Sequence, residues 1–279
     1  MNERVRMEIA AIAADTESGA TAVLERALGV LRGTAHDRAA LESVADELCR
    51  AQPSMAGLRV AAAIARRAED PLAAIDEFRA RVARAPHAIA RHAAALLRLR
   101  RGTGAVRLVT CSRSRAVELA IRQLAEVEEV EVACAESRPA LEGRELAVSL
   151  AAGGVTVTVY SDAGIATAVA ASDALLVGAD AIGPDTFINK AGTSALAALA
   201  AAEGVPTYVL AGREKILPAA VFDELVLRAG SLSELWDSAP QTIRLANPYF
   251  ERIRTAVVAA FVTEGGVAPC DGIVELSLV

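Results

Sequence analysis

A cysteine and an aspartate each follow a short apolar run, at the point where the chain turns polar. Cys111 comes after residues 106–110, and Asp180 comes after the run 174–177 and a glycine-alanine pair. In a parallel α/β sheet, ligands gather outside the carboxyl ends of the strands. A thiol and a carboxyl group at that edge could act together as base and acid. Either residue alone could instead be structural, since free cysteines pack as small apolar side chains and aspartates favour turns.

The sequence predicts opposite pKa shifts for these two groups. Cys111 precedes a predicted helix, whose dipole would lower the pKa of a thiol. Asp180 has apolar neighbours, and burial among them would raise the pKa of a carboxyl group. Groups shifted apart in this way make a natural acid and base. The three histidines (His36, His87 and His92) all fall in the first part of the chain, so no Ser-His-Asp arrangement is suggested.

A phosphate could bind where the chain enters a helix at Gly192 or Thr193. Free backbone N–H groups and the positive end of the helix dipole favour an anion at such a place. Lys190 would add a point charge, Asn189 lies next to it, and Arg138 could hold an anion through two N–H groups. The alternative is that Thr193 is an ordinary N-cap and Lys190 is solvated.

Short valine- and leucine-rich runs alternate with alanine-rich stretches after residue 103. This alternation is typical of βαβ units and predicts a parallel, Rossmann-like sheet. The predicted strands are 106–110, 129–134, 155–160, 174–178 and 206–211. The predicted helices are 113–126, 143–152, 164–171, 192–203 and a final one at about 249–263.

Residues 1–102 have a different pattern and predict a helical domain. Alanine is abundant there, apolar residues recur at three- and four-residue spacing, and no alternating β-branched run occurs. We therefore expect an α/β protein with a helical domain at 1–102 and a Rossmann-like domain at 103–279.

Composition and missing motifs exclude several classes of protein. The net charge of −6 argues against a non-specific nucleic-acid binder. The four cysteines include no CxxC pair, so neither a disulfide framework nor a metal site is predicted. The glycines of Gly102-Thr-Gly104 precede a strand instead of following it, and no phosphate-loop motif occurs, so no nucleotide cofactor is expected. With no run of about 20 apolar residues, we expect a cytoplasmic protein without a membrane partner.

Several short motifs follow one another in an order that resembles a known family. They include Cys-Ser-Arg-Ser, Glu-Ser-Arg-Pro-Ala-Leu-Glu-Gly, Val-Gly-Ala-Asp-Ala-Ile, Asn-Lys-Ala-Gly-Thr and Asn-Pro-Tyr-Phe-Glu. Their positions are 111–114, 136–143, 177–182, 189–193 and 247–251, with further matches at 52–56, 205–209 and 263–266. The family joins the alpha, beta and delta subunits of translation initiation factor 2B with isomerases acting on methylthioribose 1-phosphate and ribose 1,5-bisphosphate.

The resemblance implies a fold, an assembly and a catalytic pair. It implies an N-terminal helical domain, a C-terminal Rossmann-like domain with the ligand between them, and at least a homodimer. In the isomerase branch, a cysteine after the first strand and the aspartate of Gly-Ala-Asp are catalytic, and they match Cys111 and Asp180. The Asn-Lys pair that contacts substrate matches Asn189 and Lys190.

The chain departs from the isomerase pattern at two places. Ser18-Gly19-Ala20 stands where the isomerases carry Arg-Gly-Ala at their phosphate site. Thr110-Cys111-Ser112 stands where they commonly carry His-Cys-Asn. Arg113 or Arg138 could take over the phosphate contact. These departures also keep a second interpretation open, a non-catalytic regulatory subunit that binds a nucleotide or sugar phosphate.

From these residues we predict an isomerase that converts an aldose 1-phosphate into a ketose 1-phosphate. The favoured substrate is ribose 1,5-bisphosphate, because Gly-Ala-Asp-Ala-Ile at 178–182 resembles that branch more than the Gly-Ala-Asp-Arg of methylthioribose-phosphate enzymes. Asp180 would protonate the ring oxygen. Cys111 would either remove the C2 proton in an enediolate route or polarise the substrate during a hydride shift.

Overall fold

The computed structural model describes residues 3–15, 20–100, 104–227 and 229–279. Its first part is helical, as the alanine-rich sequence predicts. Tight packing of small and branched side chains holds these helices together. The helices are α1 (Glu3–Ala14), α2 (Ala20–Thr34), α3 (Arg38–Ala51), α4 (Ala56–Arg67) and α5 (Pro71–Arg100).

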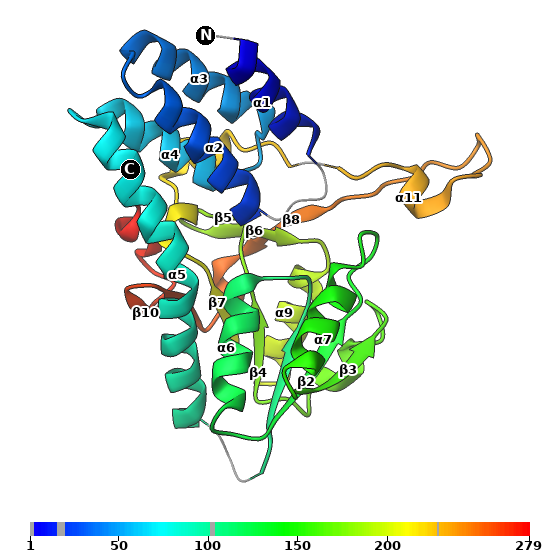
Figure 1. Cartoon of the computed structure of the whole chain (residues 1–279). Helices are drawn as coiled ribbons and strands as arrows, with labels where there is room; N and C mark the ends of the chain where they lie inside the picture. Colours follow the sequence, from blue (N-terminus) through cyan, green and yellow to red (C-terminus); the bar gives the residue numbers. More distant parts are fainter. Residues whose placement is uncertain (1–2, 16–19, 101–103, 228) are drawn as a thin grey trace.

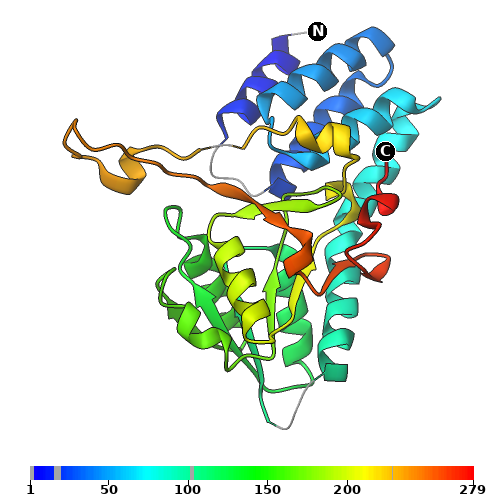
Figure 2. The ribbon, with the colours of Figure 1, turned by 180° about the vertical axis from the view of Figure 1, so that it is seen from behind.

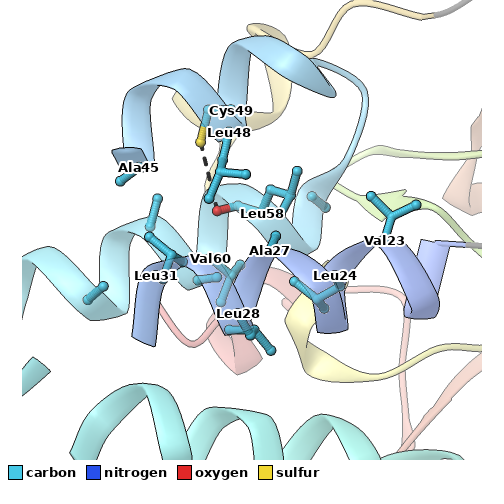
Figure 3. Packing of buried hydrophobic residues seen from close by; sticks show 14 of the residues in the cluster. Val23, Leu24, Ala27, Leu28, Leu31, Ala45, Leu48, Cys49, Leu58 and Val60 are labelled. Carbon is cyan, nitrogen blue, oxygen red and sulfur yellow. Dashed lines mark hydrogen bonds between the residues drawn. The ribbon is translucent and has the colours of Figure 1, made fainter. Parts of the chain in front are cut away.

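Leucines from three helices meet in the centre of this helical region. Figure 3 shows Leu28 and Leu31 of α2 in one cluster with Leu48 of α3 and Leu58 of α4, all of them buried. The thiol of Cys49 donates to the carbonyl oxygen of Leu58 at 3.8 Å. Burying side chains of this size stabilises the fold by about 2 kcal/mol each. Cys49 is therefore explained by packing and by one weak hydrogen bond.

Helix α5 belongs to two cores at once. Ile75 and Phe78, near its start, pack in the helical core. Ile89 and Leu97, further along, pack in a second core with the sheet. In Figure 1 this single helix runs from the other helices down the side of the sheet region. The division into 1–102 and 103–279 stays a prediction about folding units.

The second part of the chain is a mostly parallel sheet, which confirms the predicted α/β class. Its strand order is β10-β9-β7-β4-β1-β2-β3, and β10 is antiparallel to β9. The predicted strands appear within one or two residues of their expected bounds. They are β1 (Val106–Thr110), β2 (Val130–Ala135), β3 (Thr156–Tyr160), β4 (Ala174–Val177) and β7 (Thr207–Leu210).

Helices cover both faces of this sheet. Side chains of α5, α6 (Arg115–Ala125) and α7 (Glu142–Ala152) pack on one face. Those of α8 (Ala166–Val169) and α9 (Thr193–Ala202) pack on the other. Figures 1 and 2 show these two layers from opposite sides. A sheet covered in this way explains why its central strands are apolar on both faces.

The predicted final helix at about 249–263 is wrong. That segment forms β8 (Phe250–Arg254), a short 3-10 turn (Thr255–Val257) and β9 (Ala260–Thr263). The reason is long-range pairing, because β8 lies against β6 (Thr186–Lys190) and β9 against β7.

A small second sheet, absent from the sequence prediction, lies between the helices and the large sheet. Its strand order is β5-β6-β8, all antiparallel, with β5 at Ala181–Ile182. Its buried side chains Ala181 and Ile188 join the helical core, whereas Ile182 and Phe187 join the core of the large sheet. This sheet therefore fixes residues 181–190 between the two parts of the molecule.

The described residues 229–249, which precede β8, include a long arm that projects from the rest of the molecule. Figures 1 and 2 show it projecting sideways around α11 (Ser233–Trp236). Leu232, Leu235, Trp236 and Ile243 expose between 44% and 51% of their surface along it.

Four smaller elements complete the described chain: η1 (Arg213–Lys215), α10 (Ala219–Asp223), β10 (Gly266–Ala268) and η3 (Ile273–Leu276). None of the described helices combines the length and the apolar character needed to cross a bilayer.

Candidate active site

Cys111 lies directly after β1, in the middle of the large sheet, and is 7% exposed. Its Sγ atom lies 3.6 Å from the hydroxyl oxygen of Thr193. Burial raises the pKa of the Cys111 thiol to about 11, and the hydrogen bond with Thr193 opposes this rise. The sequence predicted a lowered pKa, which is wrong. Helix α6 begins only at Arg115 behind the N-cap Ser114, so burial outweighs the helix dipole.

Asp180 follows β4 and directly precedes β5. Its backbone N–H donates to the carbonyl oxygen of Ile188 at 2.7 Å, which places Asp180 beside the middle of β6. Burial raises the pKa of its carboxyl group, whereas Lys215 and Lys190 act in the opposite direction. The predicted upward shift is confirmed.

Lys190 is buried and paired, so it is not the solvated lysine of the alternative interpretation. Its side chain is 4% exposed, and its Nζ atom lies 2.8 Å from Oε1 of Glu142. The same Nζ lies 4.6 Å from the centre of the Tyr249 ring. The charge of Glu142 raises the pKa of both Cys111 and Asp180. The charge of Glu142 therefore acts on both candidate catalytic groups.

Hydrogen bonds tie the loops after three strands into one network. The hydroxyl of Ser112 donates to Oε1 of Glu142 at 3.0 Å. The backbone N–H of Ser112 donates to the hydroxyl oxygen of Ser137 at 2.7 Å. The carboxylate of Asp162 accepts from the backbone N–H groups of Ser137 and Arg138, both at 2.7 Å. The loops after β1, β2 and β3 are thus held in a fixed arrangement.

Helix α9 begins as predicted, with Gly192 as N-cap at φ 102° and Thr193 as its first residue. The positive φ favours glycine at this position. The backbone N–H groups of Gly192 and Ser194 both donate to Oε1 of Glu251, each at 2.8 Å. A carboxylate of the protein already occupies the place where the sequence predicted a bound phosphate. Asn189 donates from Nδ2 to the Thr193 hydroxyl at 3.0 Å.

The two candidate arginines lie at the outer edge of this site. Arg113 is 48% exposed in its side chain and pairs with Glu145 at 2.5 Å. Arg138 is exposed, and its Nη2 atom donates to the carbonyl oxygen of Glu234, at the base of the arm, at 3.4 Å. Ser18, the other residue considered for the phosphate, lies outside the described residues. Hence the structure joins Cys111 to the buried network but leaves the arginines at its rim.

Sequence reasoning missed the roles of Glu142, Glu251 and Lys215. The Nζ atom of Lys215 donates to the carbonyl oxygen of Ala179 at 2.6 Å, next to Asp180. Lys215 follows β7, whose carboxyl end lies at the same sheet edge, and this signal could have found it. Glu251 had no such signal, because its partner in β6 is far away in the sequence. In the described part of the chain, no group of three or more His, Cys, Asp or Glu side chains could hold a metal ion.

Comparison with known proteins agrees with these motifs. The family model described as "Initiation factor 2 subunit family" matches residues 5–270. The chain belongs to this family. The match to the Initiation factor 2 subunit family covers the helical region, the sheet and every candidate site residue.

The chain is similar to proteins named as isomerases of two different sugar phosphates. Ribose 1,5-bisphosphate isomerase of Methanocaldococcus jannaschii is 28% identical over 169 residues, which cover 59% of this chain and 55% of that protein. A probable bifunctional methylthioribose-1-phosphate isomerase/methylthioribulose-1-phosphate dehydratase of Nocardia farcinica is 33% identical over 276 residues, covering 90% of this chain and 50% of that protein. The chain therefore spans about half the length of these two relatives.

A solved structure matches over nearly the full length. The crystal structure of Pyrococcus horikoshii translation initiation factor eIF-2B has a TM-score of 0.81 and 25% identity, covering 96% of this chain and 98% of that one.

Proposed function

We propose that this protein is a sugar-phosphate isomerase that converts an aldose 1-phosphate into a ketose 1-phosphate. The observation that carries the proposal is that Cys111 and Asp180 each follow a strand of the large sheet, have a pKa raised by burial, and feel the charge of Glu142, the partner of Lys190. Relatives named as isomerases of two such sugar phosphates support the reaction class. Catalysis requires groups that hold or move protons at a water-poor site, and both candidates meet that requirement.

Asp180 is the proposed general acid. Phosphate on the anomeric oxygen prevents the sugar ring from opening as a free hemiacetal does, so the ring oxygen must be protonated. Burial raises the pKa of Asp180, which favours the protonated carboxyl group that this step requires. As the bond between C1 and the ring oxygen breaks, one hydrogen must move from C2 to C1. The carboxylate left behind can accept the 2-hydroxyl proton as the ketone forms, which restores the acid.

Cys111 is the proposed partner in the hydrogen transfer. With a pKa of about 11, only about one thiol in ten thousand is ionised at neutral pH. In the ligand-free protein the thiol is therefore protonated, a state that suits polarisation of the substrate during a hydride shift. The enediolate route would use the thiolate to take the C2 proton and return it to C1, and it would require a lower pKa in the complex.

The substrate that we favour is ribose 1,5-bisphosphate, ahead of methylthioribose 1-phosphate. Arg113 and Arg138 at the rim, with Lys190 inside, are the proposed contacts for its phosphates. Asn189, with Gly192 and Thr193 behind it, shapes the inner wall. The Oε2 atom of Glu142 is buried and has no hydrogen-bond partner among the described residues, so it is a ready acceptor for a sugar hydroxyl.

A second candidate function is a regulatory subunit that binds a sugar phosphate or nucleotide without converting it. Two observations favour it. The eIF-2B structure matches over nearly its whole length. Glu142 already neutralises Lys190, and Glu251 already fills the start of α9, so two places for a phosphate hold carboxylates of the protein.

Phosphorus and proton NMR of the purified protein separates these functions. The protein is incubated with ribose 1,5-bisphosphate and, in a second sample, with methylthioribose 1-phosphate. Conversion of either sugar to its ketose, lost in Cys111→Ser, supports the isomerase and identifies its substrate. Line broadening without conversion of either would contradict the isomerase and support the regulatory subunit.

We also propose that the working form is a homodimer or a larger assembly of this chain. The apolar side chains exposed on the arm, among them Trp236, support this. Light scattering behind a sizing column is expected to give at least twice the chain mass. A monomer at micromolar concentration would contradict the proposal.

A further inference from the structure

The hydroxyl group of Thr193 lies at the centre of three contacts. The residue is fully buried. Its Oγ1 atom lies 2.6 Å from the carbonyl oxygen of Lys190 and 3.6 Å from Sγ of Cys111. It also accepts the side-chain N–H of Asn189 at 3.0 Å. One small side chain thus joins the candidate catalytic thiol to the Asn-Lys pair.

The contacts of the Thr193 hydroxyl depend on whether Cys111 is a thiol or a thiolate. A threonine hydroxyl has one proton to donate and two lone pairs that accept. The carbonyl oxygen of Lys190 and the amide of Asn189 fix two of the three contacts, because a carbonyl can only accept and an N–H can only donate. When Cys111 is a thiol, its S–H can donate to the remaining lone pair, and all partners are satisfied. A thiolate can only accept, so the Thr193 proton would have to turn from Lys190 to Sγ.

We propose that Thr193 is a positioning residue whose single hydroxyl proton stabilises the thiolate form of Cys111 and couples it to the Asn189–Lys190 strand end. Its part in turnover rests on the proposed isomerase function, whereas its effect on the thiol does not. The sequence favoured a substrate contact for Thr193. Its complete burial and its three protein partners support a role behind the reacting groups instead.

The charged groups around Cys111 cannot stabilise a thiolate. Asp162, Glu142 and Glu251 are the charges that act on its titration, and all three raise the pKa of the thiol. Thr193 acts in the opposite direction, through a hydrogen bond. Among these contributions, the Thr193 hydroxyl is the one that lowers the pKa of the thiol.

The hydroxyl is held in place from two sides. Its bond to the Lys190 carbonyl spans the turn between β6 and α9. Glu251 fixes the same turn by accepting from Gly192 and Ser194. A rotation of the Thr193 hydroxyl is thus enough to change partners, and no movement of the backbone is needed.

Alkylation of Cys111 by iodoacetamide tests this inference without relying on turnover. Only the thiolate reacts, so below the pKa of the thiol the rate falls tenfold for each unit by which that pKa rises. Rates are measured at mildly alkaline pH on the peptide that contains Cys111, by mass spectrometry. Thr193→Val removes the hydroxyl at nearly constant shape and is expected to slow alkylation about tenfold or more. Thr193→Ser keeps the hydroxyl and should react within about twofold of the wild type.

Glu251→Gln is the matched control for a loosened helix start. It removes a negative charge near Cys111 but leaves the Thr193 hydroxyl in place, so its alkylation should be unchanged or faster. Slowing in Thr193→Val but not in Thr193→Ser or Glu251→Gln supports the inference. Equal rates in Thr193→Val and wild type, or equal slowing in Thr193→Val and Thr193→Ser, would overturn it. Thr193→Ala repeats the test if the valine variant does not fold.

The design separates this inference from the proposed function. If Thr193→Val slows alkylation but the wild-type protein converts neither sugar, the effect of Thr193 on Cys111 stands and the isomerase function is rejected. If the wild-type protein converts a sugar but Thr193→Val is alkylated at the wild-type rate, the isomerase function stands and the role of Thr193 is rejected. If both hold, the pH dependence of turnover in Thr193→Val is expected to change, with recovery in Thr193→Ser.

Discussion

The site contains two sets of cationic side chains that differ in their surroundings. Lys190 forms an inner pair with Glu142, buried and fixed beneath the Tyr249 ring. Arg113 and Arg138, the outer arginines, lie exposed at the rim and contact Glu145 or a backbone carbonyl. A buried ion pair is difficult to separate, because each partner would be left unpaired in a poorly solvated place.

The difference suggests a division of labour. The inner pair is suited to fixing geometry, because it is rigid and its charges largely cancel. The outer arginines are suited to meeting a phosphate, because exposed ion pairs are weak and can be exchanged for a doubly charged ligand at little cost. Under the proposed function, Cys111 and Asp180 would carry out the chemistry in the buried inner layer, and the arginines would capture the anion at the rim.

The largest expected effect concerns turnover. Cys111→Ser and Asp180→Asn should each reduce the isomerisation rate by about 10²–10⁴-fold, because each removes a group that handles a proton. Initial rates from phosphorus NMR measure the loss, and circular dichroism checks the fold. A variant that keeps most of its activity would show that the chemistry does not lie with the inner layer.

Breaking the inner pair should affect stability next most strongly. Glu142→Gln leaves Lys190 buried without an opposite charge and should lower the free energy of unfolding by on the order of 3 kcal/mol. Urea titration followed by circular dichroism gives this value. A loss no greater than that caused by replacing an outer arginine would break the comparison.

The pH dependence of stability should reveal the environment of Asp180. Its pKa is raised above the ordinary 3.8 by burial. Its favourable contribution is therefore complete below 3.8 and is lost as the pH rises through the raised pKa. Asp180→Asn stays neutral, so the unfolding free energy of the variant minus that of the wild type should increase from pH 3.8 towards neutrality. A flat difference would show that Asp180 is as well solvated as an ordinary surface aspartate.

The smallest effect on stability is expected at the outer arginines. Arg113→Ala and Arg138→Ala should each change the free energy of unfolding by less than about 1 kcal/mol, yet raise the KM for a sugar phosphate. Arg107→Ala is the matched control, since Arg107 is also exposed and pairs with Glu131 near the start of β1. Equal KM values in all three variants would remove the arginines from phosphate binding.

Most of the sheet could be predicted, because its strands and helices carry local patterns. The runs at 106–110 and 174–177 are apolar and short, and each ends at a polar turn, so the sequence alone was enough to place Cys111 and Asp180 at the sheet edge. The small sheet could not be predicted. Strand β8 owes its conformation to β6, about 60 residues away in the chain, and a tertiary contact of this kind leaves no local period.

The charges of the site were harder to predict than its positions. The upward shift of Asp180 followed from its apolar neighbours alone. Cys111 was assigned the wrong direction, because its distance from the helix start and its burial against Thr193 depend on the folded loop. Similarly, the sequence shows a helix start suited to an anion, but not that Glu251 would reach it from another strand.

Helix α5 has a consequence for recombining parts of related proteins. Because Ile75 and Phe78 serve one core while Ile89 and Leu97 serve the other, a chimaera joined near residue 102 would inherit one half of an interface from each parent. A crossover inside α5, between Val82 and Ala85, would keep the α5 side chains of each core on their own side of the junction. The division of α5 between the two cores therefore lies inside a helix, while Ala181, Ile188 and Phe222 would still reach the helical core from the other parent.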